Sequence, residues 1–461
     1  MVRFLLGLIV LSSFGCANKS GECASVFFGG EIVNPTSDYV VLYRNDTYVD
    51  SVRLDDSNRF SFTLQGIDEG LYHFNHEPEL QYIYLQEGDS LLARLNTVEF
   101  DESLVFSGKG SEVNNFLMEM FLAYESEEPL VYNYYGLDPD DFSNKVDSLR
   151  HMKISHLNEM LADVEMSDRA FNLIKASVDY NNYIYKEKYP FFHRRKTGEE
   201  TVHDFDNTFY KYRDSINFND RDLTYFKPYF DFMKWHFGNL SYMQCMEDCN
   251  RDEQVGSNHL HFNKHKLHLV DSLVDEQDIR DVLFRNIAVD YLIKEHKSDP
   301  ECQLFINKFN MLSSNGEHKK EIDDLYRSIQ QLQSNHTLPD LVLKDANGQD
   351  ISLKTIAGRK KNTVIYFWTA AKERQFRNTS QRIAELKKKY PKHNFVGINL
   401  KTSFSQWNAL LDQYGLDKSS QFYGENFKEI QLAMVIDKIN KCVITQDTII
   451  VDGFGDLYSS L

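Results

Sequence analysis

The chain has 461 residues, of which 42% are hydrophobic, and it carries a formal net charge of −18 at pH 7. Its length is sufficient for about three domains, each with its own core. The acidic balance argues against a sequence-independent nucleic-acid binder, because such proteins need clustered Lys and Arg to contact phosphates.

The N-terminus has the layout of a secretory signal. Arg3 is followed by an apolar run that ends at Leu11 and by small residues that lead to Cys16. The run is too short to cross a bilayer as a helix. Its end, "SSFGC", resembles the cleavage site of a bacterial lipoprotein, in which the cysteine is lipidated and becomes the first residue of the mature chain. Ser13 stands where leucine is usual in that site.

We therefore expect residues 1–15 to be a lipoprotein signal peptide, Cys16 to carry the lipid and residues 16–24 to form a tether. A lipid anchor would hold the rest of the chain in the cell envelope, at the outer membrane or in the periplasm. Soluble secretion and an uncleaved anchor are the alternatives. With Cys16 lipidated, five of the six cysteines remain. Since this number is odd, at least one of them is unpaired within the chain.

Residues 25–110 show the alternation of a β domain. In "FSFTL", residues 60–64, large apolar residues alternate with Ser and Thr. Turn-forming segments such as "LDDSN" and "QEGD" separate runs of this kind. Short alternating strands joined by turns predict an antiparallel β domain that resembles a sandwich.

Residues 111–335 change to a helical period. One predicted helix face combines Val113, Phe116, Leu117, Met120 and Phe121, and another combines Ile279, Leu283, Ile287 and Tyr291. This spacing predicts a helical domain. Two aromatic segments between these helices, "YNNYIYKEKYPFF" and "YFKPYFDFMKWHF", are interpreted as irregular. Their aromatic residues are expected to belong mainly to the core, with a groove for peptide or carbohydrate as the alternative.

Cys245 and Cys249 are four residues apart, which puts both sulfur atoms on one face of a helix. Together with His261 and His265 they approach a zinc-finger spacing. The pair follows an aromatic helical stretch instead of a β-hairpin, so the sequence does not predict a metal site. A Cys245–Cys249 disulfide, a structural metal and no special role all stay open.

Residues 336–461 alternate between β and α patterns. Thr363–Trp368 is a nearly continuous apolar strand of the kind that is buried on both faces. A helical pattern, the strand "NFVGINL" and a second helix around Trp407 follow, and then two further strands, "CVITQDTIIVD" and "DLYSSL". This order predicts a compact α/β domain. The chain as a whole is therefore predicted to be a multidomain α+β protein, with an N-terminal antiparallel β domain, a helical middle domain and a C-terminal α/β domain.

This last domain resembles the TlpA-type, thioredoxin-like thiol-disulfide oxidoreductases that bacteria keep outside the cytoplasm. The order of signal, β domain, helical insert and α/β domain is also similar to thioredoxin-like lipoproteins of Bacteroidetes-type bacteria. The matching residues are Pro339, Asn347, Gly348, Leu353, Gly358, Phe367, Trp368, Trp407, Asp452 and Gly455.

The resemblance fails at the reactive positions. The family motif is Phe-Trp-x-x-Trp-Cys-x-x-Cys, but Lys372 stands at the nucleophilic cysteine and Gln375 at the resolving one. Alignment to Asp452 puts the family's cis-proline at Gln446. Disulfide exchange needs a thiolate and a second thiol, so the resemblance implies a degenerate redox site with no catalytic residue and no cofactor.

The leading hypothesis is a lipid-anchored pseudoenzyme that serves as a binding or scaffold module. Its partner would be an unknown envelope protein or peptide, its membrane contact the lipid anchor, and no nucleic acid would be involved. One alternative is a thiol-disulfide oxidoreductase that uses Cys245 and Cys249, or Cys442. The other is a surface structural protein that binds through its β or helical domain.

Overall fold

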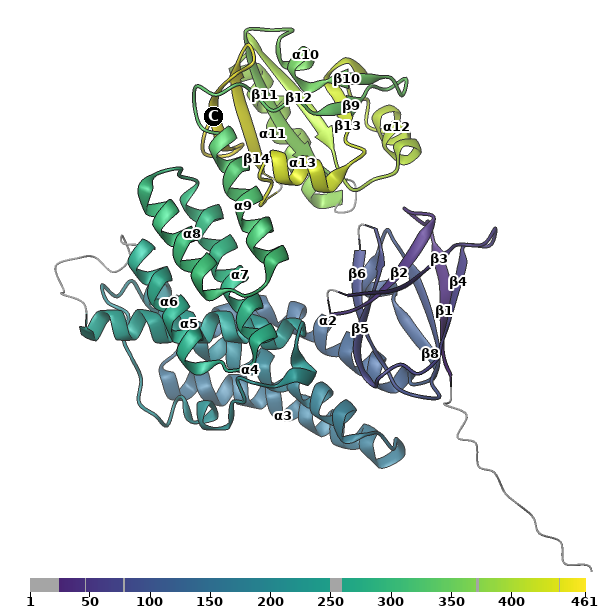
Figure 1. The fold of residues 1–461 in the computed structure, drawn as a ribbon, viewed down its shortest axis with the longest axis vertical. Coiled ribbons are helices and arrows are strands. Elements are labelled where there is room, and N and C mark those ends of the chain that lie inside the picture. Colours follow the sequence, from purple (N-terminus) through teal and green to yellow (C-terminus); the bar gives the residue numbers. More distant parts are fainter. Residues whose placement is uncertain (1–24, 46, 78, 249–258, 370–372, 439) are drawn as a thin grey trace, which may run out of the picture.

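The computed structural model describes residues 25–461 except residues 46, 78, 249–258, 370–372 and 439. These residues form two β-sheets, a helical middle part and a C-terminal α/β domain, in chain order (Figure 1). The predicted fold class is therefore confirmed. None of the helices in the described ranges is long and apolar enough to span a lipid bilayer.

The β domain consists of two four-stranded sheets, with strand orders β4-β1-β7-β8 and β3-β2-β5-β6. Phe28, Phe62 and Phe74 are fully buried between the sheets. One pair, β1 with β7, is parallel, which the alternating pattern could not predict because it does not specify neighbours. The elements are β1 (Val26–Val33), β2 (Tyr39–Arg44), β3 (Thr47–Arg53), β4 (Arg59–Leu64), β5 (Gly70–His76), β6 (Glu79–Leu85), β7 (Ser90–Asn96), α1 (Phe100–Ser103) and β8 (Val105–Lys109).

The helical domain contains the two predicted apolar faces, in α2 and α7. The interpretation of the aromatic segments as irregular is wrong, because the first lies inside α4 and all but the first two residues of the second lie in α5. Their rings recur at helical spacing, and Pro228 falls in the first turn of α5, where a missing N–H is tolerated. The helices are α2 (Ser111–Tyr134), α3 (Pro139–Asp163), α4 (Asp168–Thr197), α5 (Lys227–Asp248), α6 (His259–Leu273), α7 (Gln277–Glu295), α8 (Pro300–Leu312) and α9 (Gly316–Gln331). Two short 3-10 helices, η1 (Lys211–Ser215) and η2 (Arg221–Leu223), lie between α4 and α5.

The C-terminal domain is built on a seven-stranded sheet of order β10-β9-β13-β12-β11-β14-β15. Helices α11 and α12 pack on one face, and α10, α13 and α9 pack on the other. β11 is buried on both faces, as its apolar run predicts. The elements are β9 (Val342–Lys344), β10 (Asp350–Ser352), α10 (Leu353–Ala357), β11 (Asn362–Trp368), α11 (Glu373–Lys389), β12 (His393–Asn399), α12 (Phe404–Gln413), η3 (Lys418–Ser420), β13 (Gln421–Tyr423), α13 (Phe427–Ala433), β14 (Lys441–Gln446) and β15 (Ile449–Asp456).

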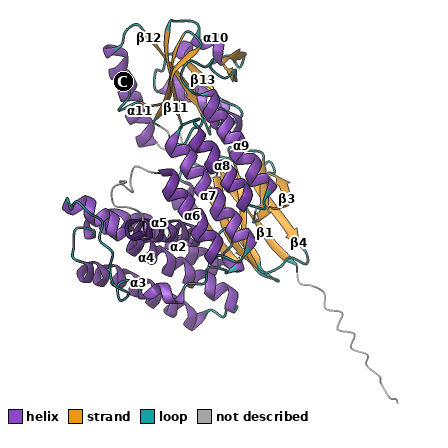
Figure 2. Ribbon diagram, turned by 60° about the vertical axis from the view of Figure 1, so that its left-hand side comes forward, coloured by secondary structure: helices purple, strands orange, loops and turns teal. Residues whose placement is uncertain are grey.

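An apolar core joins the helical and α/β domains. Helix α9 leads from one to the other (Figure 1, Figure 2), and its Ile322 and Ile329 belong to the same buried cluster as Ile430 of α13. The segment after α9 then runs beside β15, where Asn335 donates to Ile450 O at 2.8 Å. The α/β sheet is thereby fixed on the helices through one of its faces.

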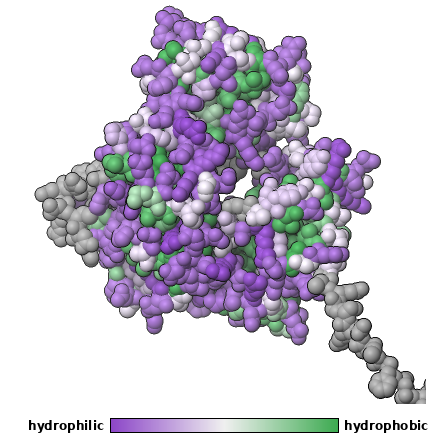
Figure 3. All heavy atoms as spheres, in the orientation of Figure 1, coloured by the Kyte–Doolittle hydropathy of each residue, from purple (hydrophilic) through white to green (hydrophobic). Residues whose placement is uncertain are grey.

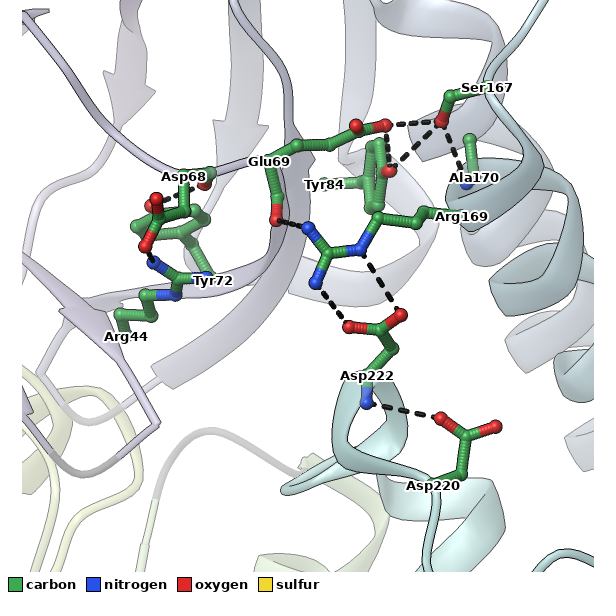
Figure 4. Close-up of polar contacts among 10 residues, drawn as sticks. All are labelled: Arg44, Asp68, Glu69, Tyr72, Tyr84, Ser167, Arg169, Ala170, Asp220 and Asp222. Atoms are coloured by element: carbon green, nitrogen blue, oxygen red, sulfur yellow. Dashed lines mark hydrogen bonds and ion pairs between the residues drawn. The ribbon is translucent and has the colours of Figure 1, made fainter.

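A polar seam joins the β domain to the helical domain (Figure 4). The Tyr84 hydroxyl donates to Glu69 Oε1 at 2.5 Å, and Ser167, the N-cap of α4, donates to the same carboxylate. Arg169 donates to Glu69 O at 3.0 Å and forms a two-point ion pair with Asp222. Bidentate pairs of this kind fix orientation as well as distance.

Glu187 is the centre of a buried charge cluster in the helical domain. Its carboxylate is fully buried and accepts hydrogen bonds from Arg213 at 2.6 and 2.9 Å, from Tyr212 and from Asn239, while His236 Nδ1 lies 2.8 Å away. Burial acts to raise the pKa of Glu187, but the charges and hydrogen bonds of His236 and Arg213 outweigh it and lower the pKa to about 2. The folded state therefore favours the ionised carboxylate.

This pKa predicts an acid-sensitive contribution to stability. The pKa of Glu187 lies below its ordinary value of 4.5, so the contribution is complete above that value and is lost as the pH falls toward 2. Between about pH 5 and about pH 3 the wild-type protein should lose about 2 kcal/mol more unfolding free energy than Glu187→Gln. Urea denaturation at both pH values measures this, and equal losses in the two proteins would contradict the assignment.

Candidate functional site

Three parallel strands of the α/β sheet end in one row. The register pairs Trp368 at the end of β11 with Asn399 of β12, and Asn399 with Tyr423 of β13. In α/β sheets, ligands bind outside the carboxyl ends of parallel strands. We therefore expect a ligand site at the loops that follow this row.

A buried polar network supports the end of β11. The Trp368 indole Nε1 donates to Gln421 Oε1 at 3.0 Å, and Gln421 Nε2 donates to the Tyr366 hydroxyl at 2.9 Å. Gln421 is only 2% exposed. Burial raises the pKa of Tyr366 to about 12, so its hydroxyl stays neutral. The network holds the Trp368 ring in one orientation at the end of β11.

Two buried polar groups close to this row lack hydrogen bonds. Asn399 is fully buried, and within the described parts of the chain neither its Oδ1 nor its Nδ2 has a partner. The same is true of the indole nitrogen of Trp407, whose ring lies 5.7 Å from that of Tyr423. Each group left this way costs on the order of 1–3 kcal/mol. Native proteins tolerate such costs mainly at functional sites.

A polar cavity of about 260 Å³ lies between this edge of the sheet and the β domain. Lys401 and Glu425 line it from the loops after β12 and β13, and Asn75 and Glu77 line it from the β domain. Lys428 Nζ lies 3.5 Å from Glu77 across the gap, and both side chains are largely exposed. The face in Figure 3 is hollowed where the β and α/β domains meet.

The family model of AhpC/TSA matches residues 335–455. Residues 335–455 form a thioredoxin-like domain. The match covers the sheet, the loops at the carboxyl ends of its parallel strands and helices α10 to α13, whereas helix α9 and the cavity residues Asn75 and Glu77 lie outside it. No curated protein matches the chain.

Several solved structures are similar to this chain. A thioredoxin-like protein from Bacteroides caccae is 14% identical, with coverage of 50% of this chain and 90% of its own and a TM-score of 0.30. The thioredoxin domain of a thiol-disulfide oxidoreductase from Bacteroides vulgatus is 15% identical, with coverages of 26% and 87% and a TM-score of 0.23. A thiol:disulfide interchange protein from Bacteroides sp. is 14% identical, with coverages of 26% and 81% and a TM-score of 0.23.

The degenerate redox positions follow the end of β11. Gln375 lies in the first turn of α11 and is partly exposed, whereas Lys372 lies outside the described residues. The strand that carries a redox loop in this fold is thus present, and so is the helix that follows it. An amine and an amide occupy the sequence positions of the two sulfur atoms.

The position predicted for the cis-proline is wrong. Gln446 pairs with Asn362 at the start of β11, at the opposite end of the strand from Trp368. The error arose because "CVITQDTIIVD" was interpreted as one strand, whereas it forms two strands around a turn at Asp447 and Thr448. The residue of β14 nearest the site end of β11 is Lys441, whose neighbour Cys442 pairs with Tyr366.

Lys441 is a buried cation that sequence reasoning missed. It is 1% exposed, its Nζ donates to Val435 O at 2.8 Å, and it lies 4.5 Å from the centre of the Phe454 ring. Burial lowers its pKa to about 8. Gln421 and Asn399 were also missed. Asn399 is the last residue of β12 and Gln421 is the first of β13, so neither interrupts an apolar run and the sequence has no local signal for them.

The described cysteines, which include the proposed nucleophiles Cys245 and Cys442, are buried. Cys442 is fully buried on β14, and burial raises the pKa of its thiol to about 12. Cys302 is 1% exposed, and burial raises its pKa to about 11. Cys245 is also buried, with its Sγ 3.1 Å from His265 Nδ1. Cys249 lies outside the described residues, so the disulfide with Cys245 stays a prediction.

The structure brings together part of the zinc-like spacing. Cys245 of α5 contacts His265 of α6, and the His261 and His265 rings are 6.3 Å apart. Within the ranges that the structure describes, no group of three or more His, Cys, Asp or Glu side chains is arranged to hold a metal ion. Cys16 lies outside those ranges as well, so its lipidation also stays a prediction.

Gln421→Leu tests the network that supports Trp368. The change removes two buried hydrogen bonds and leaves the Trp368 indole and the Tyr366 hydroxyl unsatisfied, so it should lower the unfolding free energy by about 1–3 kcal/mol. Urea denaturation measures the loss. Gln381→Leu, an exposed position on α11, is the matched control and should change stability by less than about 0.5 kcal/mol. Equal effects at both positions would contradict the role of the network.

Proposed function

We propose that this protein is a lipid-anchored envelope protein whose thioredoxin-like domain binds a protein or peptide and does not exchange disulfides. The observation that carries the proposal is the replacement of both motif cysteines, by Lys372 and Gln375. Exchange proceeds by attack of a thiolate and resolution by a second thiol. Neither an ammonium group nor an amide performs either step.

The burial of the described cysteines supports the same conclusion. With a pKa of about 12, the Cys442 thiol would be ionised in on the order of one molecule in 10⁵ at neutral pH. The Cys302 thiol is also almost fully protonated at neutral pH, because its pKa is about 11. Reactive cysteines are partly exposed and have lowered pKa values. Cys442 and Cys302 have the opposite properties, because both are buried and burial raises the pKa of each thiol.

The polar cavity at the carboxyl edge supports a binding role. Side chains of both signs surround it, from two domains, including Lys401, Glu425 and Glu77. The orphaned amide of Asn399 lies in the adjacent row of strand ends. A surface of this kind offers hydrogen bonds and charge to a polar partner without offering a reactive atom.

The envelope location rests on the N-terminal sequence. Arg3, the short apolar run and the small residues before Cys16 support export and lipidation. A single diacyl-modified cysteine would place the β domain nearest the membrane, because it is the first domain after the tether.

An insulin-reduction assay tests the absence of disulfide exchange. The purified protein, supplied with dithiothreitol, should not accelerate insulin reduction above the rate with dithiothreitol alone, because it lacks a thiolate at the site. A thioredoxin with an intact Cys-x-x-Cys pair is the positive control. Clear acceleration that disappears in Cys442→Ser or Cys245→Ser would overturn the proposal in favour of the oxidoreductase alternative.

Replacing Cys16 tests the anchor. In bacterial cells the wild-type protein should partition into the detergent phase and incorporate labelled fatty acid, and Cys16→Ser should do neither, because the acyl chains attach to that sulfur. Cys23→Ser is the matched control and should behave as the wild type. Equal membrane association of Cys16→Ser and wild type would contradict lipidation.

A further inference from the structure

A groove separates the β domain from the helical domain on the side of strand β6. It has a volume of about 450 Å³ and is lined by β6, α2 and the beginning of α5, with contributions from α1 and α4. Leu117, Met120 and Phe226 form buried apolar parts of its lining, and Leu80 is 46% exposed. This groove is separate from the carboxyl edge of the thioredoxin-like domain.

Strand β6 is an edge strand that borders the groove. It is the last strand of its sheet and pairs with β5 alone. At Tyr84 its outer side is covered by Asn114 of α2, whose Oδ1 accepts from Tyr84 N at 2.7 Å and whose Nδ2 donates to Tyr84 O at 3.0 Å. The side-chain amide of Asn114 thus takes the place of a neighbouring strand.

The strand geometry extends this arrangement toward the groove. In an antiparallel pair, backbone groups that face away from the partner strand recur every second residue. Since the backbone groups of Tyr84 face α2, those of Leu80 point to the same side, and Leu80 lines the groove. The amide of Asn114 reaches Tyr84 and no further along the strand. Tyr82 O accepts from the side chain of Gln81 at 3.2 Å, a contact that an added strand would replace.

The groove is acidic. Four carboxylates line it, and Lys227 is the one cation among the described lining residues. Lys227 is already paired with Asp231. Glu125 and Glu128 are exposed on α2, and in the described part of the chain neither forms an ion pair. The groove therefore combines an apolar floor with excess negative charge.

We propose that this groove binds an extended peptide that combines apolar and basic residues, added as a strand to β6. The groove-lining residues Leu117 and Met120 precede Glu125 and Glu128 along one face of α2, so apolar side chains of the peptide can cover the first two while its Lys or Arg side chains reach the two carboxylates. Main-chain hydrogen bonds to an edge strand supply affinity in such complexes, and the side-chain positions supply specificity. The inference does not depend on whether the thioredoxin-like domain is redox-active.

Fluorescence anisotropy with a labelled peptide of about eight alternating Lys and Val residues tests the proposal on the purified protein. Saturable binding is expected, weakening as salt rises because the charges are exposed. A peptide of alternating Glu and Val should not bind. The Lys-Val peptide with N-methylated backbone amides should bind at least about tenfold more weakly, a difference of about 1.4 kcal/mol. Equal binding of the methylated peptide would overturn strand addition.

Charge reversal locates the site. The double variant Glu125→Lys and Glu128→Lys should weaken binding by at least about tenfold. The control double variant Glu159→Lys and Asp163→Lys, at exposed positions of α3, should leave binding unchanged. Circular dichroism melts establish that both variants are folded. Failure of the wild-type protein to bind the Lys-Val peptide, or equal binding by the two folded variants, would overturn the proposal. The comparison of peptides uses only the wild-type protein, so its result is valid even if charge reversal impairs folding.

Discussion

The arrangement of the molecule depends on the apolar core that α9 shares with the α/β sheet. Side chains of α9 and α13 belong to one buried cluster that continues through the helical domain. Burial of this kind contributes roughly 25 cal/mol for each Å² of apolar surface removed from water. Because one face of the sheet is occupied in this way, the carboxyl ends of its parallel strands face the β domain across the polar cavity. The candidate site thus combines two domains, and neither supplies it alone.

The hydrogen bonds that shape this edge of the sheet do not involve the positions of the two motif cysteines. Trp368, Gln421 and Tyr366 form a buried chain of hydrogen bonds that orients the end of β11. The chain of bonds involves no cysteine, so the shape of this edge does not depend on thiols at positions 372 and 375. The proposed binding role needs only this edge, since function lies in the site and not in the fold.

The sequence predicted more of the fold than of the site. Period-two and period-3.6 patterns are strong over long segments, so the β, helical and α/β parts followed from them. The aromatic segments in α4 and α5 are interpreted as irregular from the sequence, although their rings recur at helical spacing. The β14–β15 hairpin was missed because its turn, Asp447-Thr448, lacks Gly and Asn. Because of that error, the position predicted for the cis-proline, Gln446, lies at the end of β14 that is far from Trp368. Pairings such as Gln421 with Trp368, 53 residues apart, have no local signal.

The two proposed binding regions differ in the groups that they offer to a partner. The carboxyl edge of the thioredoxin-like domain offers mixed charge and polar groups, whereas the groove beside β6 offers an edge strand, covered by Asn114 at Tyr84, with excess carboxylate. Both lie where the β domain meets another part of the chain, with the seam of Glu69, Arg169 and Asp222 fixing it against the helices. The β domain therefore contributes to both binding surfaces as well as linking the chain to its predicted anchor.

The central claim is that the described thiols take no part in disulfide exchange. Mass-spectrometric mapping of the pH dependence of iodoacetamide alkylation, cysteine by cysteine in the folded protein, tests it most directly. Cys442 and Cys302 should stay unmodified at neutral pH and react only when the protein is unfolded, because burial raises the pKa of each thiol above 10. Rapid alkylation of either at neutral pH, with a midpoint below about 8, would contradict the account.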